Sequence, residues 1–266
     1  MATVVLTRPQ GKNQALAADL QQHGIDTLLL PALSLTPTLS TLPASYRPAD
    51  FDLLVFVSAQ AAQYYLDALA VSGLAFMPNQ RIATVGAASA QPFYQAGLAD
   101  KVQLIHPPAA HPYQDSEALW ALLTPHLDSV QRVLLVRGQQ GREWLTEQLL
   151  LHNKTVERCC VYERVPALWF GSATQRLQDL LTTQPDTVTI LLTSSESTYA
   201  IAENMVQLNL EPQWQNANFV AIHPRIAQAL KDVTTSASLP FDLRITVCAP
   251  SQPAILKALL SVTKPD

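Results

Sequence analysis

The sequence has few charged residues and few cysteines, and each shortage excludes a class of protein. Charged side chains make up 14% of the 266 residues, against roughly 25% in a typical soluble protein. The net charge is −4 and no basic stripe is present, which argues against a nucleic-acid-binding protein. There are three cysteines, two of them adjacent (Cys159 and Cys160). This odd count argues against a disulfide framework and favours a reducing cytoplasm.

Long hydrophobic runs and the common cofactor motifs are also missing. The longest apolar runs fall far short of the roughly 18 residues needed to cross a bilayer. The opening segment has no basic region before an apolar stretch, so we expect neither a secretory signal nor a membrane contact. The sequence contains no P-loop, no GxGxxG and no GxSxG, and its six histidines lack metal-ligand spacing. We therefore expect no cofactor and no metal.

What the sequence does have is a regular alternation of short apolar runs with helical patterns. Because strands in such an alternation are apolar on both faces, the pattern predicts an α/β protein with parallel sheets covered by helices on both sides. The predicted strands are Val4–Leu6, Leu28–Leu30, Leu53–Val57, Ile82–Val85, Val133–Val136, Val156–Val161, Thr189–Leu192, Phe219–Ile222 and Ile245–Cys248. The predicted helices are Asn13–His23, Ala59–Leu69, Ala88–Ala96, Ser116–Leu123, Glu143–Leu151, Ser197–Gln207, Arg225–Leu230 and Pro253–Leu260. Gly24 is expected to end the first helix.

Three short motifs occur twice, in the same order, which predicts a duplicated α/β unit. Val4–Gly11 resembles Val133–Gln140, with Arg8 and Arg137 at matching positions 129 residues apart. Phe56-Val57-Ser58 resembles Leu192-Thr193-Ser194, and Val85–Ala90 resembles Ile222–Ala227. Proline-bearing stretches at 34–38 and 162–166 follow the two copies of the first motif and predict crossings between two domains.

The turn from Arg137 to Arg142 is the strongest local candidate for a binding site. Gly138 and Gly141 allow a tight turn between a strand and a helix, and the two arginines add positive charge. The free amides at a helix N-terminus favour an anion such as a carboxylate or phosphate. An ordinary turn with solvated arginines is the alternative.

Hydroxyls and small residues follow several other predicted strands. In open α/β sheets, ligands bind beyond the carboxyl ends of the strands, so these residues are candidate ligand contacts. Ser and Thr at such positions also cap helices without any ligand, and that alternative stays open. Arg225 at a helix start opposes the helix dipole, which favours an anion nearby. The candidates are Ser58, Gly86, Ser89, Ser194, Ser195, Pro224 and Arg225.

In their order and spacing, these segments resemble the uroporphyrinogen-III synthase family over nearly the whole chain. The matching segments are Val4–Pro9, Phe56–Ala61, Thr84–Ala90, Asp115–Leu119, Val133–Gly138, Gly141–Glu143, Val161–Arg164, Leu192–Glu196 and Ile222–Ala227. The resemblance implies two α/β domains, one discontinuous (1–35 with 167–266) and one continuous (39–163). A two-stranded connector at about 34–38 and 161–166 would join them, and the substrate would lie in the cleft between the domains.

The resemblance also implies an activity. The family closes the linear tetrapyrrole hydroxymethylbilane into a ring with loss of water and inversion of ring D, without a cofactor. It implies Tyr162 as the catalytic residue, whose phenol would donate a hydrogen bond to the departing hydroxyl. A connector tyrosine that only packs is the alternative. Arg8, Arg137, Gly138 and Arg142 join the strand-end residues above as substrate contacts.

The remaining expectations concern partners and rival functions. We expect a cytoplasmic monomer, open to transient contact with the enzyme that makes hydroxymethylbilane. A two-domain binding module for small anions, without chemistry, is the alternative from another class. A nucleotide-sugar glycosyltransferase is a weaker rival, since it should carry a clearer diphosphate site.

Overall fold

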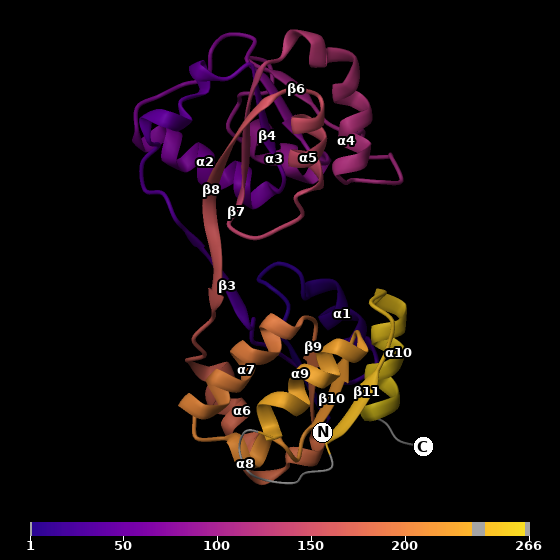
Figure 1. Ribbon diagram of the computed structural model, residues 1–266. Coiled ribbons are helices and arrows are strands. Elements are labelled where there is room, and N and C mark those ends of the chain that lie inside the picture. The colour runs from indigo at the N-terminus through magenta and orange to yellow at the C-terminus, as the bar shows by residue number, and fades with distance from the viewer. Residues whose placement is uncertain (1, 236–242, 264–266) are drawn as a thin grey trace. The chain divides into compact units, whose positions relative to one another are not determined.

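The computed structural model describes residues 2–235 and 243–263, and within it the chain forms two compact units. Unit 1 comprises Met1–Ser34 and Val165–Asp266, and unit 2 comprises Leu35–Arg164. The chain passes from one unit to the other within β3 and again within β8, which are adjacent in one sheet. Figure 1 shows both units, each with strands flanked by helices. Each unit is described by itself below.

The strands are β1 (Thr3–Leu6), β2 (Asp26–Leu29), β3 (Leu33–Pro37), β4 (Leu53–Phe56), β5 (Arg81–Thr84), β6 (Gln103–Ile105), β7 (Arg132–Gly138), β8 (Thr155–Pro166), β9 (Val188–Leu192), β10 (Asn218–Ala221) and β11 (Arg244–Val247). The α-helices are α1 (Gln14–Gln22), α2 (Ala59–Val71), α3 (Ala87–Gln95), α4 (Ser116–Leu123), α5 (Trp144–Leu151), α6 (Ser172–Thr183), α7 (Ser195–Gln207), α8 (Glu211–Trp214), α9 (Pro224–Thr235) and α10 (Gln252–Thr263). Short 3-10 helices lie at Ala44–Tyr46, Pro48–Asp50, Thr124–Ser129 and Pro185–Thr187.

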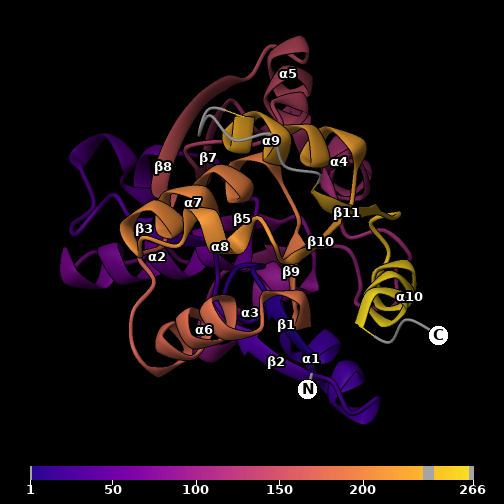
Figure 2. The same cartoon turned by 90° about the horizontal axis from the view of Figure 1, so that it is seen from below.

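Unit 1 is built on a parallel sheet with the strand order β11-β10-β9-β1-β2. Successive residues of β1 point to opposite faces of the sheet, and both faces are buried. Val4 and Leu6 pack with α1 and α10, whereas Val5 packs with the helices from α6 to α9. Figure 2 shows α1 and α10 on the side of the sheet opposite α6 and α7. This two-faced burial explains why β1 is a continuous apolar run.

Unit 2 is built on a sheet with the order β3-β8-β7-β4-β5-β6, in which the neighbours from β8 to β6 are parallel. The same alternation divides its core. Leu54 and Phe56 of β4 pack toward α2 and α3, where Phe56 meets Tyr65 and Phe93 in edge-to-face contacts. The other face, with Leu53 and Val55, packs against α4 and α5. The predicted α/β class with parallel sheets is confirmed.

The two sheets have the same strand order once the repeated motifs are matched. Each pair of repeated motifs has one member in each unit. The motif strands β1, β9 and β10 of unit 1 correspond to β7, β4 and β5 of unit 2, respectively. Unit 1 then reads β11-β10-β9-β1-β2, and unit 2 reads β6-β5-β4-β7-β8, with β3 added at the edge. In unit 2, α4 leads from β6 to β7, whereas in unit 1 the corresponding α10 is the last helix and β1 the first strand. The predicted repeat therefore corresponds to two related sheets with different chain connections.

Several boundaries and elements differ from the sequence prediction. The second strand is Asp26–Leu29 instead of Leu28–Leu30, because its pairing with β1 begins at Asp26. β6, α6 and α8 were not predicted, since they are short or mostly polar. Gly24 has a φ of +73° just after α1, the left-handed conformation expected at a helix end.

Candidate functional site

Each sheet has a point where its chain connections leave in opposite directions. In unit 2, β4 leads to β5 on one side and β7 leads to β8 on the other, so this point lies between β4 and β7. In unit 1 it lies between β9 and β1. In open α/β sheets, ligands usually bind at this point, beyond the carboxyl ends of the strands. The predicted site residues at these strand ends are described unit by unit.

In unit 2, Ser58 lies two residues after the end of β4 and caps α2. Its Oγ accepts a hydrogen bond from the Ala61 N–H at 3.0 Å, so the capping alternative is confirmed for this residue. The same oxygen lies 3.4 Å from the hydroxyl of Tyr162 on β8. Capping and a contact with the tyrosine therefore coexist at one serine.

Tyr162 is held against the end of β7 by a close backbone approach. A Cβ placed on Gly138 would lie 2.5 Å from the Tyr162 ring, so only glycine leaves room for it. The Gln139 N–H donates to the Tyr162 carbonyl at 2.9 Å. A register shift between Arg137 and Gly138 pairs Gly138 with Tyr162, a local bulge of the kind that re-aims side chains. Tyr162 is only 8% exposed.

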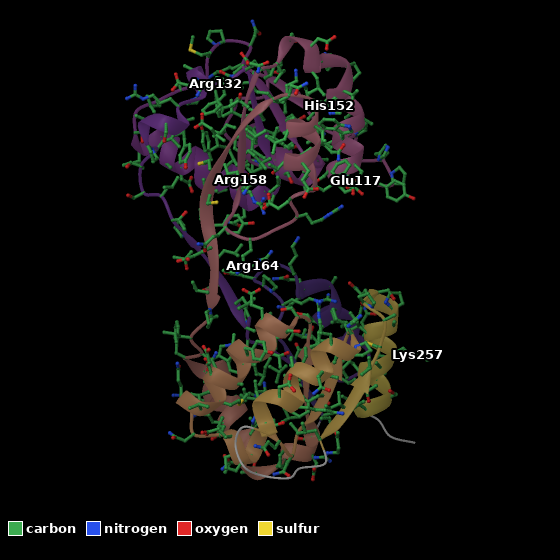
Figure 3. All side chains as sticks on the ribbon, in the orientation of Figure 1. Glu117, Arg132, His152, Arg158, Arg164 and Lys257 are labelled. Atoms are coloured by element: carbon green, nitrogen blue, oxygen red, sulfur yellow. The ribbon has the colours of Figure 1, made fainter. Side chains whose placement is uncertain are left out.

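The two arginines of the β7–α5 turn are paired with carboxylates. The Arg137 guanidinium is buried, and its Nη1 donates to Glu143 Oε1 at 2.8 Å. Arg142 is exposed and pairs with Glu117 at the start of α4, a residue that Figure 3 labels. The hydrogen bond from Arg142 lowers the pKa of Glu117 and raises the pKa of Arg142 itself. Neither arginine is a simple solvated side chain.

Gly86 and Ser89 lie at the next strand end, after β5. Gly86 is the N-cap residue of α3, and Ser89 is buried in its first turn. The Ala87 N–H donates to Gln114 Oε1 at 2.8 Å, and Gln114 Nε2 donates back to Pro108 and His111 carbonyls. An amide oxygen of the protein thus occupies the anion-favouring end of α3. The sequence prediction missed Gln114, because the 106–115 stretch has no periodic pattern.

In unit 1, the corresponding strand ends carry Arg8 and Ser194. The Thr7 hydroxyl donates to the Leu191 carbonyl, which ties β1 to β9, and Arg8 follows with its carbonyl accepting from Asn13 Nδ2 at 2.9 Å. Ser194 caps α7 through a reciprocal capping box with Ser197, which confirms the capping alternative here as well. The Ser195 Oγ is buried and has no hydrogen-bond partner among the described residues.

Pro224 and Arg225 begin α9 in unit 1. Pro224 is the first helical residue, a position where a missing N–H costs nothing. The Arg225 side chain is exposed, and the Arg225 backbone N–H donates to His223 Nδ1 at 3.1 Å. Ile226, which matches Ser89 in the repeat, is buried in the core. This strand end therefore offers no side-chain hydroxyl at that position.

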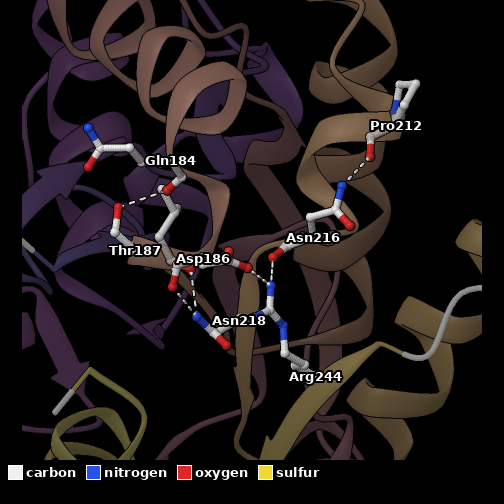
Figure 4. A network of polar contacts seen from close by, with 8 residues as sticks. Gln184, Asp186, Thr187, Pro212, Asn216, Asn218 and Arg244 are labelled. Carbon is white, nitrogen blue, oxygen red and sulfur yellow. Dashed lines mark hydrogen bonds and ion pairs between the residues drawn. The ribbon is translucent and has the colours of Figure 1, made fainter. Parts of the chain in front are cut away.

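The opposite ends of the unit 1 strands carry a polar network of a different kind. Arg244 at the start of β11 donates to the Asp186 carboxylate at 2.5 Å and to the Asn216 carbonyl. Asn218 at the start of β10 donates to the Asp186 carbonyl. Figure 4 shows these contacts joining the strand starts to the turns before them. Since they lie at the amino ends of the strands, we assign them to the fold.

Among the predicted site residues, Ser58, Gly138 and Tyr162 are brought into contact, and Gly86 and Ser89 lie at the adjacent strand end. Arg8, Ser194, Ser195, Pro224 and Arg225 are in unit 1. Within residues 2–235 and 243–263, no three His, Cys, Asp or Glu side chains form a group that could hold a metal ion. None of the helices in those ranges is long and apolar enough to cross a membrane.

Comparisons with known proteins show which family the chain resembles. The chain is 26% identical over 187 residues to uroporphyrinogen-III synthase of Chlorobaculum parvum, which covers 68% of this chain and 70% of that protein. It is 36% identical over 92 residues to the chloroplastic enzyme of Oryza sativa subsp. japonica, a match that spans 34% of this chain and only 30% of the rice protein. Uroporphyrinogen-III synthetase of Helicobacter pylori 26695 has the same fold, with a TM-score of 0.52 at 16% identity, over 98% of this chain and all of that one.

The family match covers most of the chain. The model described as "Uroporphyrinogen-III synthase HemD" matches residues 14–239, a range that includes both strand-end regions of unit 2 and most of unit 1. The chain belongs to the uroporphyrinogen-III synthase family.

Proposed function

We propose that this protein cyclises hydroxymethylbilane to uroporphyrinogen III, with loss of water and inversion of ring D. Family membership supports the reaction. The observation that connects this reaction with named residues is the position of the Tyr162 hydroxyl. It lies 3.4 Å from Ser58 Oγ, at the carboxyl ends of β4 and β7. A hydrogen-bond donor that is packed in place at a ligand-binding edge suits a reaction that needs no cofactor.

The chemistry sets what the site must do. Loss of hydroxide from the ring-A hydroxymethyl group leaves an azafulvenium cation, which ring D attacks through its substituted carbon to give a spiro intermediate. That intermediate fragments and closes again with ring D inverted. Without the enzyme, closure leaves ring D unturned. The protein must therefore hold a reactive cation in one geometry, which depends on proximity and fixed dipoles.

We assign the hydrogen bond to the departing hydroxyl to Tyr162. Hydroxide is a poor leaving group, and a donor helps most once negative charge has developed on the oxygen. Ser58 Oγ already accepts from Ala61, so its own proton is available to the Tyr162 oxygen. In that arrangement the phenol keeps its proton for the substrate. A serine donating to a tyrosine that donates to the leaving group is the simplest chain these contacts allow.

Binding of the eight substrate carboxylates is assigned to free backbone amides and to three arginines at the strand ends. The first turns of α2, α5, α7 and α9 leave N–H groups without helical partners, which favour anions. Arg8 and Arg225 add charge in unit 1 and Arg142 in unit 2. Since the protein is net acidic, local charge must outweigh the average field. Raising the ionic strength should weaken substrate affinity; an affinity that does not depend on salt would count against these arginines.

The deciding experiment is incubation with freshly prepared hydroxymethylbilane, followed by oxidation and separation of the porphyrin isomers. Formation of the type III isomer at a rate above spontaneous closure supports the proposal. If only the type I isomer forms, at the spontaneous rate, while the substrate still binds, the protein is an anion-binding module without chemistry. Chelator should leave the activity unchanged, and its loss and recovery with one metal would contradict the proposed reaction.

We also propose that the protein is a cytoplasmic monomer. The odd number of cysteines, all free among the described residues, is consistent with a reducing compartment. Sedimentation velocity at several concentrations tests the monomer, and co-sedimentation with the enzyme that makes hydroxymethylbilane tests a transient contact between the two.

A further inference from the structure

Arg137 is a buried charge that the proposed reaction does not use directly. Its side chain is 4% exposed, while that of its partner Glu143 is 43% exposed. A buried guanidinium must be paired and hydrogen-bonded to be tolerated. Its hydrogen-bond partners are Gly138 at the end of β7 and Glu143 at the start of α5, and their positions indicate what the charge is for.

These contacts lead from the start of α5 to the end of β7. Arg137 Nη1 donates to Glu143 Oε1 at 2.8 Å, and Arg137 Nε donates to the Gly138 carbonyl at 3.2 Å. Gly141 has a φ of +152°, and a Cβ there would lie 2.8 Å from Arg137 Nη2. The turn from Gly138 to Glu143 is therefore wrapped around the guanidinium, and glycine at 141 leaves the space for it.

The same residues hold Tyr162. Gly138 pairs with Tyr162 across the bulge and packs against its ring, and Gln139 donates to its carbonyl. Glu143 also reaches β8 directly, since its Oε2 lies 3.0 Å from Arg158 Nη2. Arg158 lies on β8 four residues before Tyr162, and Figure 3 labels it on that strand. The ion pairs thus join β7, the start of α5 and β8, and Arg137 directly precedes the Gly138 that contacts Tyr162.

We infer that Arg137 and Glu143 are positioning residues, which fix the β7–α5 turn and through Gly138 the place of the Tyr162 hydroxyl. This inference rests on the proposed function for its kinetic consequence but not for its structural one. It gives Arg137 a role other than direct contact with a substrate carboxylate, because its guanidinium is buried and already paired. Glu143 was not among the site residues predicted from the sequence.

A double-mutant cycle separates positioning from an independent contribution. Glu143→Gln keeps the side-chain shape and removes the charge. We expect it to lower kcat by about tenfold, since small displacements at reacting centres have large effects on rate, and to change KM by less than about twofold. In the Tyr162→Phe background, where there is no hydroxyl left to misplace, the further loss should be less than about twofold. Arg137→Lys should follow the same pattern.

The strand pair offers a matched control. Arg132 and Glu157 form a 2.8 Å ion pair between the same two strands, at the opposite end of β7. Figure 3 labels Arg132 well away from Arg158. Arg132→Gln removes that pair and should leave kcat and KM unchanged in both backgrounds.

Other outcomes would overturn the inference. Losses that multiply fully between Glu143→Gln and Tyr162→Phe would mean that the two residues act independently. A raised KM at unchanged kcat for Arg137→Lys would assign Arg137 to substrate binding. Loss of the folded circular-dichroism spectrum in both variants, at a temperature where the wild type is folded, would assign the pair to overall stability.

A second readout does not need activity. In protein with 13C-labelled tyrosine rings, the Tyr162 resonance is identified by its disappearance in Tyr162→Phe. We expect it to shift in Glu143→Gln and to stay in place in Arg132→Gln. If the wild type makes no type III isomer, the proposed function fails, and this shift still decides whether Glu143 positions Tyr162. An unmoved resonance in Glu143→Gln would overturn the inference even in an active enzyme.

Discussion

The two units share a strand order but differ at the carboxyl edges of their sheets. Tyr162 in unit 2 corresponds in the repeat to Leu33, 129 positions earlier, and Gly138 corresponds to Pro9. Leu33 is part of the apolar core of unit 1, whereas Tyr162 places a hydroxyl beside Ser58. Where unit 2 has Gly138, which leaves room for an aromatic ring, unit 1 has Pro9. The repeat has kept the core alternation and changed the strand ends.

This difference shows which constraints act on each part of a duplicated sheet. Core positions of β1 and β7 must stay apolar, because both faces are covered by helices. Strand-end residues have no such demand, so a hydroxyl, a glycine or an ion pair can arise in one copy alone. Substitutions of the polar groups at the carboxyl ends of the unit 2 strands therefore test best how the two units differ.

The largest effect is expected from Gly138→Ala. A Cβ there would lie 2.5 Å from the Tyr162 ring, which has no room to retreat because it is 8% exposed. We expect turnover to fall by about 100-fold and the free energy of unfolding to fall by about 1–3 kcal/mol. Gly86→Ala is the matched variant, since its Cβ would meet the exposed Gln114 side chain, 2.6 Å from Oε1 and 3.0 Å from Cβ, instead of a buried ring. We expect smaller losses of turnover and of unfolding free energy for Gly86→Ala. Equal losses in the two variants would show that the contact between Gly138 and the Tyr162 ring has no special importance.

Tyr162→Phe should have the next largest effect and separates the hydroxyl from the ring. Phe keeps the contacts with Gly138 and Tyr64 but cannot donate to the leaving group. We expect about a tenfold lower single-turnover rate, or ~1.4 kcal/mol, with substrate affinity little changed. Tyr162→Ala should lose both ring and hydroxyl. If Phe behaves as wild type while Ala fails, Tyr162 is a packing residue and the hydroxide leaves without it.

Ser58→Ala and Ser194→Ala compare the same capping position in the two units. Each removes a cap, which typically costs about 1 kcal/mol of unfolding free energy. Ser194 also takes part in a capping box with Ser197, so thermal denaturation should show the larger loss for Ser194→Ala. Turnover should fall more for Ser58→Ala, because only Ser58 contacts Tyr162. The reverse ranking in both measurements would remove the functional difference between the units.

Much of the fold follows from sequence pattern, and the exceptions have physical reasons. α4 was predicted with its observed bounds, since Asp115 caps it and buried Leu119 and Leu123 give it a helical period. α6 was missed, because polar residues outnumber its three buried ones, Thr174, Leu177 and Leu181. β6 has three residues and an exposed Gln103, too little for an apolar run. The repeat indicated which segments correspond, but strand order depends on long-range pairing that no local pattern contains.

The candidate site was less predictable than the fold. Residue type and position after a strand identified Ser58 and Gly138, and the family resemblance identified Tyr162. The pairing of Arg137 with Glu143 could not be read from the sequence, because it depends on a turn folding back over a buried side chain. Gln114 reaches α3 from a loop 27 residues away for the same reason. Contacts made by irregular segments cannot be predicted from periodic sequence patterns.

The smallest expected effect compares two aspartates near the amino ends of the sheets. Asp52 in unit 2 accepts backbone hydrogen bonds from Gln131 and Arg132, both at 2.8 Å. The Arg132 hydrogen bond is the main cause that lowers the pKa of Asp52, with help from Gln131 and nearby arginines and against partial burial. Asp186 in unit 1 instead pairs with the Arg244 side chain and is 74% exposed, an arrangement that typically contributes little.

The sign of the pH effect follows from the lowered pKa of Asp52. Its ionised form is favoured in the folded state, so its contribution is present above the unfolded value of about 3.9 and is lost as pH falls through the folded value. Asp52→Asn should therefore lower the free energy of unfolding at pH 7 by less than ~1 kcal/mol, since the group is exposed. The difference from wild type should shrink below about pH 4. Urea denaturation at both pH values measures it, with Asp186→Asn as the matched variant. A larger loss for Asp186→Asn, or a difference for Asp52→Asn that grows as the pH falls, would show that the backbone hydrogen bonds do not stabilise the ionised carboxylate.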